Sequence, residues 1–190
     1  MKNHKVEPIK NRYVIVLMEL YLASISKRNR LIFLLGINSG LRVSDILKLN
    51  IEDVRDKNFI EIVEKKTGKY KKFPLNKKLR MLIYDYLKTE RADLVCLEKK
   101  SNPLFLSNKG KRISYERVYQ ILNQTCEDLN IEINIGTHSM RKTFAYHHYK
   151  KFNNVALLQK ILNHSSQSIT LKYIGLTQDE IDSSYSNFAL

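Results

Sequence analysis

The stretch RLIFLLGINSGLRVSDILKL, from Arg30 to Leu49, decides the fold of this chain. Its first part, Arg30 to Ile37, is apolar nearly all round, which is typical of a helix at the centre of a hydrophobic core. Ser39 and Gly40 then interrupt the pattern. The residues from Arg42 to Leu49 carry polar side chains among apolar ones, as a short amphipathic helix does. The stretch therefore predicts a central buried helix followed closely by a second helix that starts with a cation.

Apolar stripes at helical spacing continue on both sides of this stretch. Asn76 and Ser114 are suited to cap two of the helices that these stripes predict. Between them and the opening stretch, β-branched and aromatic residues lie on both sides of Thr67 and Gly68, which predicts one β-hairpin within residues 51–75. The predicted fold class is mostly α with a small antiparallel β-sheet, an α+β arrangement, and its remaining helices cover 13–22, 79–87, 118–129, 137–151 and 154–162.

The charge of the chain indicates a polyanionic partner. At 190 residues it is long enough for one domain with a sizeable core, and 33 Lys and Arg against 19 Asp and Glu give a formal net charge of +14. Nucleic acid fits this balance best, because Lys and Arg supply most sequence-independent affinity for phosphate backbones. The longest apolar run, Leu31 to Ile37, is too short to span a membrane, and the chain does not open with a signal-peptide pattern. We therefore expect a cytoplasmic protein that acts on the chromosome, with Cys96 and Cys126 reduced.

Two basic segments are candidates for phosphate binding. The segment from Gly36 to Arg42 lacks the ending of a nucleotide-binding loop, so triphosphate binding is rejected. Arg42 stands where a helix begins, which suits an anion, although an exposed arginine is often merely solvated. The predicted hairpin carries a lysine cluster that is either a solvated face or a patch that follows a phosphate backbone. Its members are Lys65, Lys66, Lys69, Lys71 and Lys72.

Two further segments contain chemically capable side chains. His138 and Arg141 are three residues apart, which places them on one face of a helix where they can share a phosphate. In LNHSSQSITLKYIG, from Leu162 to Gly175, His164 and Tyr173 are separated mainly by small polar residues. Each of these signals is weak by itself, and the usual place for a tyrosine is a half-buried one. The histidine spacings match no common zinc pattern, so a metal site is not predicted.

Taken together and in order, four segments resemble the catalytic domain of the tyrosine recombinases, the phage integrase family. Single segments are weakly specific, whereas four in the right order and spacing are strongly so. The resemblance covers the chain from about residue 12 to about residue 175 and implies the fold of that catalytic domain. The segments are GLRVSDILKL (Gly40 to Leu49), EKKTGKYKKFPL (Glu64 to Leu75), THSMRKTFA (Thr137 to Ala145) and the LNHSSQSITLKYIG stretch.

The resemblance implies a role for each matching residue. Arg42 and Arg141 hold the scissile phosphate together with His164, and Tyr173 is the nucleophile. Asp45 plausibly orients its neighbours. His138 is the candidate to accept the phenolic proton, and Lys66 to protonate the departing 5′ oxygen, with Lys65 as the alternative if the hairpin register differs by one residue. Lys69, Lys71, Lys72 and Lys142 are expected to contact DNA.

The reaction that the resemblance implies is site-specific DNA strand exchange. The tyrosine forms a covalent 3′-phosphotyrosine that conserves the bond energy, so no metal or nucleotide cofactor is required. The expected partners are double-stranded DNA, further copies of the chain in a tetramer on paired sites, and accessory DNA-bending proteins, with a monomer in the absence of DNA. Two alternatives stay open: a catalytically inactive DNA-binding accessory protein of the same fold, and a topoisomerase that tolerates many sequences.

The resemblance also suggests how the chain is divided. Residues 1–11 are expected to be a leader or linker, 12–177 the catalytic domain, and 178–190 a tail that docks on a neighbouring protomer. The chain is interpreted as either an excised catalytic domain or a naturally short member. Asn163, where relatives usually carry glycine, is expected to end a helix in the left-handed conformation. The residues after it, 165–175, are expected to form a polar, weakly anchored segment that lets Tyr173 move.

Overall fold

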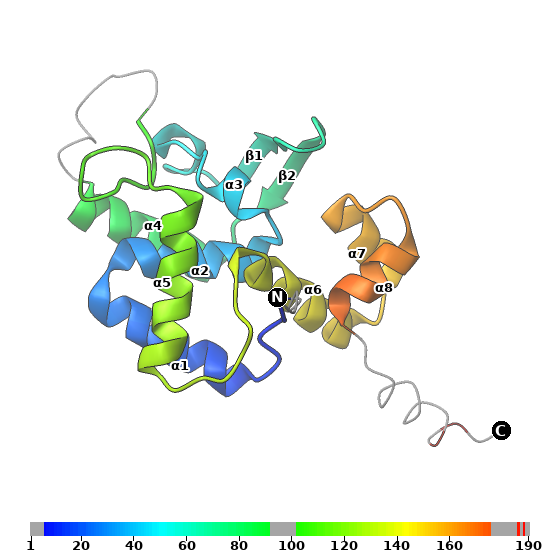
Figure 1. The fold of residues 1–190 in the computed structure, drawn as a ribbon. Coiled ribbons are helices and arrows are strands. Elements are labelled where there is room, and N and C mark those ends of the chain that lie inside the picture. The colour runs from blue at the N-terminus through cyan, green and yellow to red at the C-terminus, as the bar shows by residue number, and fades with distance from the viewer. Residues whose placement is uncertain (1–5, 92–101, 176–185, 187, 189–190) are drawn as a thin grey trace.

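Helix α2 (Lys27–Ser39) is the central element of the fold. In the computed structural model, which describes residues 6–91, 102–175, 186 and 188, α2 contacts α1 (Arg12–Ile25), α4 (Lys77–Glu90) and α6 (Thr137–Phe152) (Figure 1). Every side chain from Leu31 to Leu35 is buried. The predicted central helix is thus confirmed, because a helix covered on several sides must be apolar on all of them.

Side chains just outside the helices fix where several of them begin. Asn11 accepts a hydrogen bond from Tyr13 N at the start of α1, and Ser26 caps α2. The predicted caps Asn76 and Ser114 accept hydrogen bonds from the backbone three residues on, at the starts of α4 and α5 (Tyr115–Asp128). These boundaries are local, since each cap satisfies a backbone N–H that its own helix leaves without a partner.

The predicted hairpin is present as strands β1 (Phe59–Val63) and β2 (Tyr70–Pro74), which pair antiparallel. Ile60 lies opposite Phe73 in the register, and both side chains are buried. The opposite face of the hairpin is exposed to solvent, as the alternation of a half-buried sheet requires. The hairpin therefore has a fixed inner face, and any residue that shares it points into the protein.

The short helix α3 (Val43–Ile46) is shorter than the predicted helix over 42–49. Its end is decided by tertiary contacts: Leu104 N donates to Leu49 O, and Ile51 N donates to Asn102 O. This pairing draws the chain out of the helix and into a 3₁₀ turn, η1 (Ile51–Asp53), that the sequence pattern did not predict. A backbone that pairs with a distant segment cannot also complete a helical turn.

Helices α6, α7 (Val155–Leu162) and α8 (Gln167–Ile174) form the carboxy-terminal part of the described chain (Figure 1). Helix α8 corrects the expectation of a polar, weakly anchored segment. Ser166 caps it by accepting a hydrogen bond from Ile169 N, and Thr170 and Ile174 are completely buried. Asn163 ends α7 with φ of 53°, as predicted from its tolerance of the left-handed conformation.

The described residues before α1, 6–11, pack against the rest of the protein, although the prediction assigned them to a leader or linker. Ile9 is 1% exposed, and its N–H donates to Thr143 Oγ1 on α6. Glu7 N donates to Asn134 O. The predicted tail over 178–190 lies outside the described residues, apart from Ser186 and Phe188.

The structure bears on two further expectations, one about the cysteines and one about membrane-spanning segments. Cys126 is buried without a disulfide partner, and burial raises the pKa of its thiol to about 11. Cys96 lies outside the described residues. Among the described helices, none is long and apolar enough to cross a membrane.

Candidate active site

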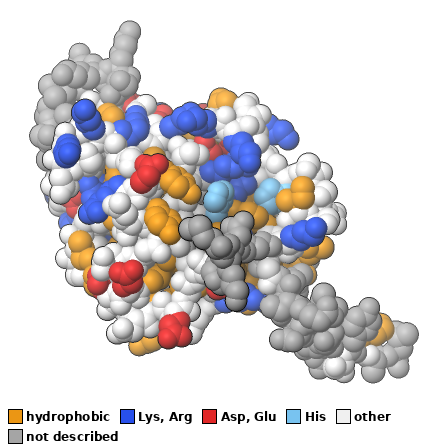
Figure 2. All heavy atoms as spheres, viewed as in Figure 1, with side chains coloured by type: hydrophobic (Ala, Val, Ile, Leu, Met, Phe, Trp, Pro, Cys, Tyr) orange, Lys and Arg blue, Asp and Glu red, His pale blue; other side chains and the backbone are white. Residues whose placement is uncertain are grey.

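Three of the four segments singled out in the sequence line one hollow in the surface, and Tyr173 of the fourth segment lies next to His138 on its wall. The hollow has a volume of about 370 Å³ and lies between the start of α3, the hairpin turn and the start of α6. On the face of the molecule shown in Figure 2, Lys and Arg side chains lie close to exposed His side chains. Its lining residues are Arg42, Val43, Ser44, Lys65, Lys66, Tyr115, Thr137, His138 and Arg141.

Arg42 reaches the hollow because α2 can end abruptly. Gly40 closes α2 with φ of +63°, and a Cβ at this position would lie 2.5 Å from Phe144 Cδ1. Glycine therefore serves both the left-handed turn and the close approach of α6. Two residues later Arg42 stands at the N-cap of α3, with its side chain 16% exposed.

Arg141 is almost completely buried, with 2% of its side chain exposed. Its Nη1 donates to Gly40 O at the end of α2, and its Nη2 donates to Leu162 O at the end of α7. A planar guanidinium can make both bonds at once because its donors form a rigid fork. Arg141 therefore joins the central helix to the carboxy-terminal helices at the edge of the hollow.

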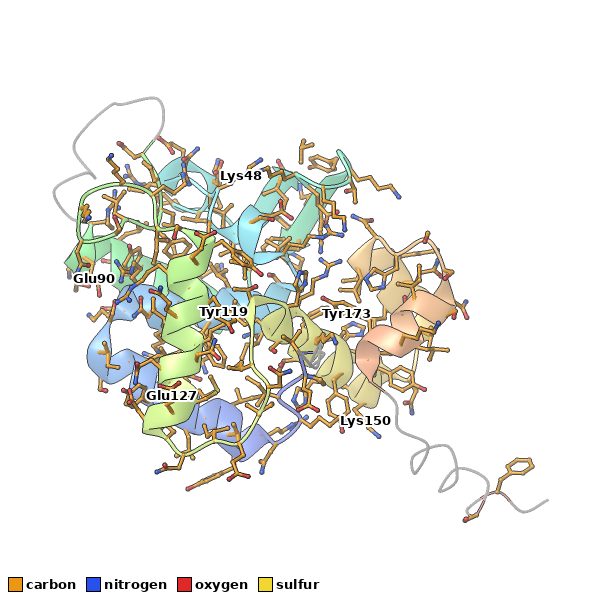
Figure 3. All side chains as sticks on the ribbon, viewed as in Figure 1. Lys48, Glu90, Tyr119, Glu127, Lys150 and Tyr173 are labelled. Carbon is orange, nitrogen blue, oxygen red and sulfur yellow. The ribbon has the colours of Figure 1, made fainter. Side chains whose placement is uncertain are left out.

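Tyr173 lies on α8, on the side that faces α6 (Figure 3). Its phenolic oxygen is 3.5 Å from Nδ1 of His138, which is long for a hydrogen bond but usual for a catalytic pair without substrate. Burial raises the pKa of Tyr173, while the nearby Arg141 and Arg42 act in the opposite direction. The phenol is therefore protonated at neutral pH and requires a base to react.

Both histidines of the site are neutral at pH 7. Burial and the charge of Arg141 lower the pKa of His138, and the same two causes lower the pKa of His164 to about 4. Nδ1 of His164 lies 3.1 Å from Thr170 Oγ1, and its ring meets the Tyr173 ring edge-on with centroids 5.1 Å apart. A neutral imidazole can accept a proton at one nitrogen and donate from the other.

The hairpin lysines divide into two groups. Lys65, Lys66, Lys69 and Lys72 are exposed, and the first two line the hollow. Lys72 forms an ion pair with Glu61 at 2.7 Å. The backbone N–H of Lys65 donates to Asp45 Oδ1 at 3.0 Å, so the carboxylate of Asp45 holds the start of the hairpin turn.

Two lysines that the sequence assigned to DNA contact are buried, and the structure corrects those assignments. Lys71 lies on the inner face of β2 with 8% of the residue exposed, and burial lowers its pKa to about 8. Lys142 is 7% exposed, and its Nζ donates to Val6 O. The period-two geometry of a strand and the packing of residues before α1 against α6 turn these side chains inward, which a charge pattern alone does not reveal.

Several residues at the site were missed from the sequence. Tyr115, Thr137 and Ser44 line the hollow, and the hydroxyl groups of Tyr115 and Thr137 are hydrogen-bonded to each other. Glu64 is fully buried and pairs with Arg42. Its place directly before Lys65 and Lys66 was the available signal, since a lone acid in a basic segment is unusual.

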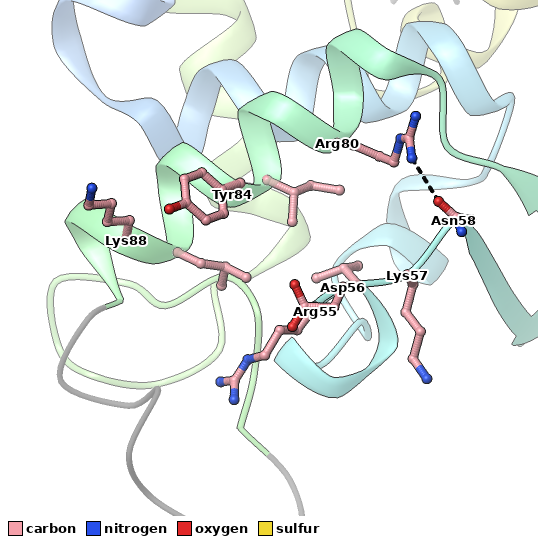
Figure 4. A pocket seen from close by; sticks show the side chains of 10 residues that line it. Arg55, Asp56, Lys57, Asn58, Arg80, Tyr84 and Lys88 are labelled. Atoms are coloured by element: carbon pink, nitrogen blue, oxygen red, sulfur yellow. Dashed lines mark hydrogen bonds between the residues drawn. The ribbon is translucent and has the colours of Figure 1, made fainter.

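A larger cavity lies elsewhere and does not share these residues. It has a volume of about 670 Å³ between α4 and the turn after η1 (Figure 4). Arg80 on its rim donates to Asn58 Oδ1, and its lining contains neither histidine nor a residue of the four segments. Within the described parts of the chain, no group of three His, Cys, Asp or Glu side chains is arranged to hold a metal ion.

Comparison with known proteins decides the family. The family model described as "Phage integrase family" matches residues 11–180. The chain belongs to the phage integrase family. The identification of a tyrosine recombinase catalytic domain from four sequence segments is thus confirmed, and with it the enzyme class of DNA breaking and rejoining. The Bacillus subtilis protein named "Probable integrase/recombinase YoeC" is 40% identical over 186 residues, which cover 97% of this chain and 98% of that protein.

Other members of the family are longer. The tyrosine recombinase XerC of Thermodesulfovibrio yellowstonii is 31% identical over 151 residues, 77% of this chain but 50% of that protein. The crystal structure of XerA superposes with a TM-score of 0.77 at 19% identity, covering 96% of this chain and 65% of that one. A post-cleavage complex of XerH with its difH substrate superposes with a TM-score of 0.74 at 23% identity, covering 96% of this chain and 54% of that one. These superpositions confirm the predicted fold class.

Proposed function

We propose that this chain is a site-specific recombinase that cleaves and rejoins DNA strands through a covalent bond between Tyr173 and a 3′ phosphate. One observation carries the proposal: the phenolic oxygen of Tyr173 lies 3.5 Å from Nδ1 of His138, beside a hollow lined by Arg42, Arg141 and Lys66. A nucleophile, a base and fixed cations within reach of one phosphate are the groups that phosphodiester transesterification needs.

Binding of the scissile phosphate is the task of the guanidinium groups. The phosphate enters the hollow and accepts hydrogen bonds from Arg42 and Arg141, with His164 donating from Nε2. Charge on the nonbridging oxygens increases as phosphorus becomes five-coordinate, so donors that are already in place stabilise the transition state more than the bound substrate. Arg141 meets this condition because two backbone carbonyls hold it before any DNA binds.

The proton transfers follow from the pKa directions. His138 is neutral because burial and Arg141 lower its pKa, and it accepts the phenolic proton at Nδ1. The Tyr173 oxygen then bonds to phosphorus while the bond from phosphorus to the 5′ oxygen breaks, and Lys66 gives that oxygen its proton. Rejoining reverses each transfer: a 5′ hydroxyl attacks the phosphotyrosine and releases Tyr173. One phosphate ester bond is formed for each one broken, so the exchange conserves bond energy.

The wider setting of the reaction is part of the same proposal. Double-stranded DNA is the proposed substrate, supported by the net charge of +14 and by the basic face in Figure 2. A homotetramer on paired sites, a monomer without DNA, accessory DNA-bending proteins and a cytoplasmic location are proposed from the family resemblance. Sedimentation of the protein with and without paired DNA sites measures the change of assembly directly.

Covalent capture tests the proposal. Duplexes with a randomised target sequence and a nick beside the cleavage position lose a short fragment after attack, so the protein stays attached to DNA. Wild type is expected to yield a denaturant-resistant adduct, and Tyr173→Phe to yield none. Tyr119→Phe, which alters an exposed tyrosine on α5, is the matched control and retains the adduct. Adduct formation by Tyr173→Phe overturns the nucleophile, and DNA binding without adduct by wild type favours the inactive accessory protein.

A further inference from the structure

Glu64 has a setting that differs from that of every charged neighbour in the hairpin turn. It directly follows β1, and its side chain is 0% exposed, whereas Lys65 and Lys66 beside it are exposed. A buried carboxylate is costly unless it is paired and hydrogen-bonded. The partners of Glu64 therefore indicate why the chain keeps a charge at this position.

Four elements converge on this one carboxylate. Arg42 Nη1, at the start of α3, lies 3.0 Å from Oε2, and Arg141 Nη1, on α6, lies 3.9 Å from Oε1. Thr67 Oγ1 in the hairpin turn donates to Oε2 at 2.7 Å, and Asn163 Nδ2 at the end of α7 donates to the same atom at 3.1 Å. Asn163 immediately precedes His164, so Glu64 contacts or adjoins every phosphate-binding group of the site.

The carboxylate is charged in this setting. Burial raises the pKa of Glu64, but hydrogen bonds from Thr67 and Asn163 and the ion pair with Arg42 outweigh burial, and the pKa lies below its ordinary value. Lys71, buried on the inner face of β2, adds a third cation to the two arginines, and Asp45 adds a second carboxylate. Without Glu64 the arginines would repel each other in an interior that screens charge poorly.

The position of Glu64 shows whether its carboxylate supports the two arginines or competes with a phosphate for them. Arg42 and Arg141 line the hollow, but Glu64 does not. The carboxylate therefore lies behind the guanidinium groups, and the side that faces DNA stays open to a phosphate. A carboxylate in front of the arginines would instead occupy the phosphate position.

We infer that Glu64 is a positioning residue for strand cleavage: its buried carboxylate holds Arg42, Arg141 and the end of α7 in one frame, so that both arginines and His164 meet the same phosphate. The inference rests on the proposed function. It assigns Glu64 no contact with DNA and no proton transfer. The residue acts through the two arginines, in the way that outer partners orient the ligands of a metal site.

Two measurements on the full chain test this role. Glu64→Gln keeps the size of the side chain and one acceptor oxygen and removes its charge, and Glu61→Gln makes the same charge change on the exposed face of the hairpin as the matched control. At saturating DNA, the single-turnover rate of adduct formation is expected to fall roughly tenfold to a hundredfold in Glu64→Gln. DNA affinity, measured on a Tyr173→Phe background, is expected to stay close to wild type. The melting temperature is expected to fall in Glu64→Gln and not in Glu61→Gln, because only the former leaves buried cations without their carboxylate. Glu64→Asp, which restores the charge on a shorter side chain, is expected to recover part of the rate.

The second measurement does not depend on activity. In the protein without DNA, ¹⁵N spectra of the arginine side chains are expected to show a distinct Arg42 guanidinium signal that Glu64→Gln shifts and broadens and Glu61→Gln leaves unchanged. An unaltered Arg42 signal or an unaltered cleavage rate in Glu64→Gln overturns the inference. If wild type forms no adduct while the Arg42 signal still responds, the proposed function fails and the ion pair stands, so the two failures are distinguishable.

Discussion

The residues proposed for catalysis are distributed over two regions that differ in how they are packed. Arg42 and the lysine hairpin belong to a body whose continuous apolar core draws on α1 to α6 and the hairpin. Tyr173 lies on α8 and His164 in the turn between α7 and α8. The described buried apolar cluster of this region consists of Ala145, Leu158, Leu162 and Ile174.

The free energy gained by packing increases with buried apolar area, so the second region is stabilised by much less packing free energy than the first. The proposed nucleophile, Tyr173, thus lies in the region with little buried apolar area, and Arg42, proposed to bind the phosphate, lies in the region with the large core. A helix takes the place of the expected flexible segment, and we expect any motion of Tyr173 to be a motion of α8 against the body. Tyr173 is carried by a helix, and motion of that helix against the body is limited by a small cluster and by the bonds of Arg141.

The largest expected effect comes from breaking the joint between the regions. Arg141→Lys cannot reach both Gly40 O and Leu162 O, because an ammonium lacks the planar fork of a guanidinium. We expect the rate of adduct formation to fall roughly a hundredfold to a thousandfold, the usual loss for one fixed transition-state donor. Single-turnover cleavage measures this loss. Arg117→Lys, on the exposed part of α5, serves as control. Equal rates in the two variants would contradict the claim that Arg141 connects the two regions.

Truncating a side chain in the small cluster is expected to lower the local stability of α7 and α8 without lowering that of the body. Leu158→Ala leaves a cavity in the carboxy-terminal cluster, and such truncations cost about 2–5 kcal/mol. Hydrogen exchange is expected to accelerate in α7 and α8 while α2 remains protected. Leu34→Ala, in the core of the body, is the paired variant and is expected to accelerate exchange throughout. If both variants give the same pattern, the two regions open as one unit and the comparison is wrong.

A smaller effect is expected from Thr170, which lies three residues before Tyr173 on the same helix. Its hydroxyl lies 3.1 Å from Nδ1 of His164 and 3.3 Å from Ser166 O, and when its single proton is donated to Nδ1 the ring proton of His164 stays on Nε2, where it can reach a phosphate. Thr170→Val keeps the shape and removes this bond, so adduct formation is expected to slow about tenfold, equivalent to ~1.4 kcal/mol. Thr170→Ser retains the hydroxyl and the rate. A slow Thr170→Ser variant would assign the effect to packing instead.

A further expected effect concerns stability in acid. The folded pKa of His164 is about 4, lowered first by burial and then by Arg141, against an ordinary value of 6.5. Between these pH values the unfolded chain binds more protons than the folded chain, so the free energy of unfolding decreases as pH falls from about 6.5 towards about 4. The stabilising contribution of neutral His164 is complete above pH ~6.5. The melting temperature of wild type is expected to fall more steeply over this window than that of His164→Gln. Parallel slopes would show that His164 is not buried in its neutral form.

Much of the fold could be predicted because its signals are local. The apolar residues of α2, the caps Asn76 and Ser114 and the helix end at Asn163 each act through their own segment. Helix α8 escaped prediction because Thr170 and Ile174 are buried by distant partners, whereas its other aliphatic residues, Ile169 and Leu171, are exposed and do not complete a buried stripe. Propensity is a weak guide wherever tertiary contacts supply the stabilisation.

The sequence by itself determined which chemical groups are present and in what order, and from these the family and the residues proposed for catalysis. Only the tertiary structure decided which charges face DNA. It placed Lys71 and Lys142 inside the protein and put the carboxylate of Glu64 behind two arginines from distant segments. The physical reason is that the environment of a charge depends on which parts of the chain pack around it, and no local pattern of residues records that packing.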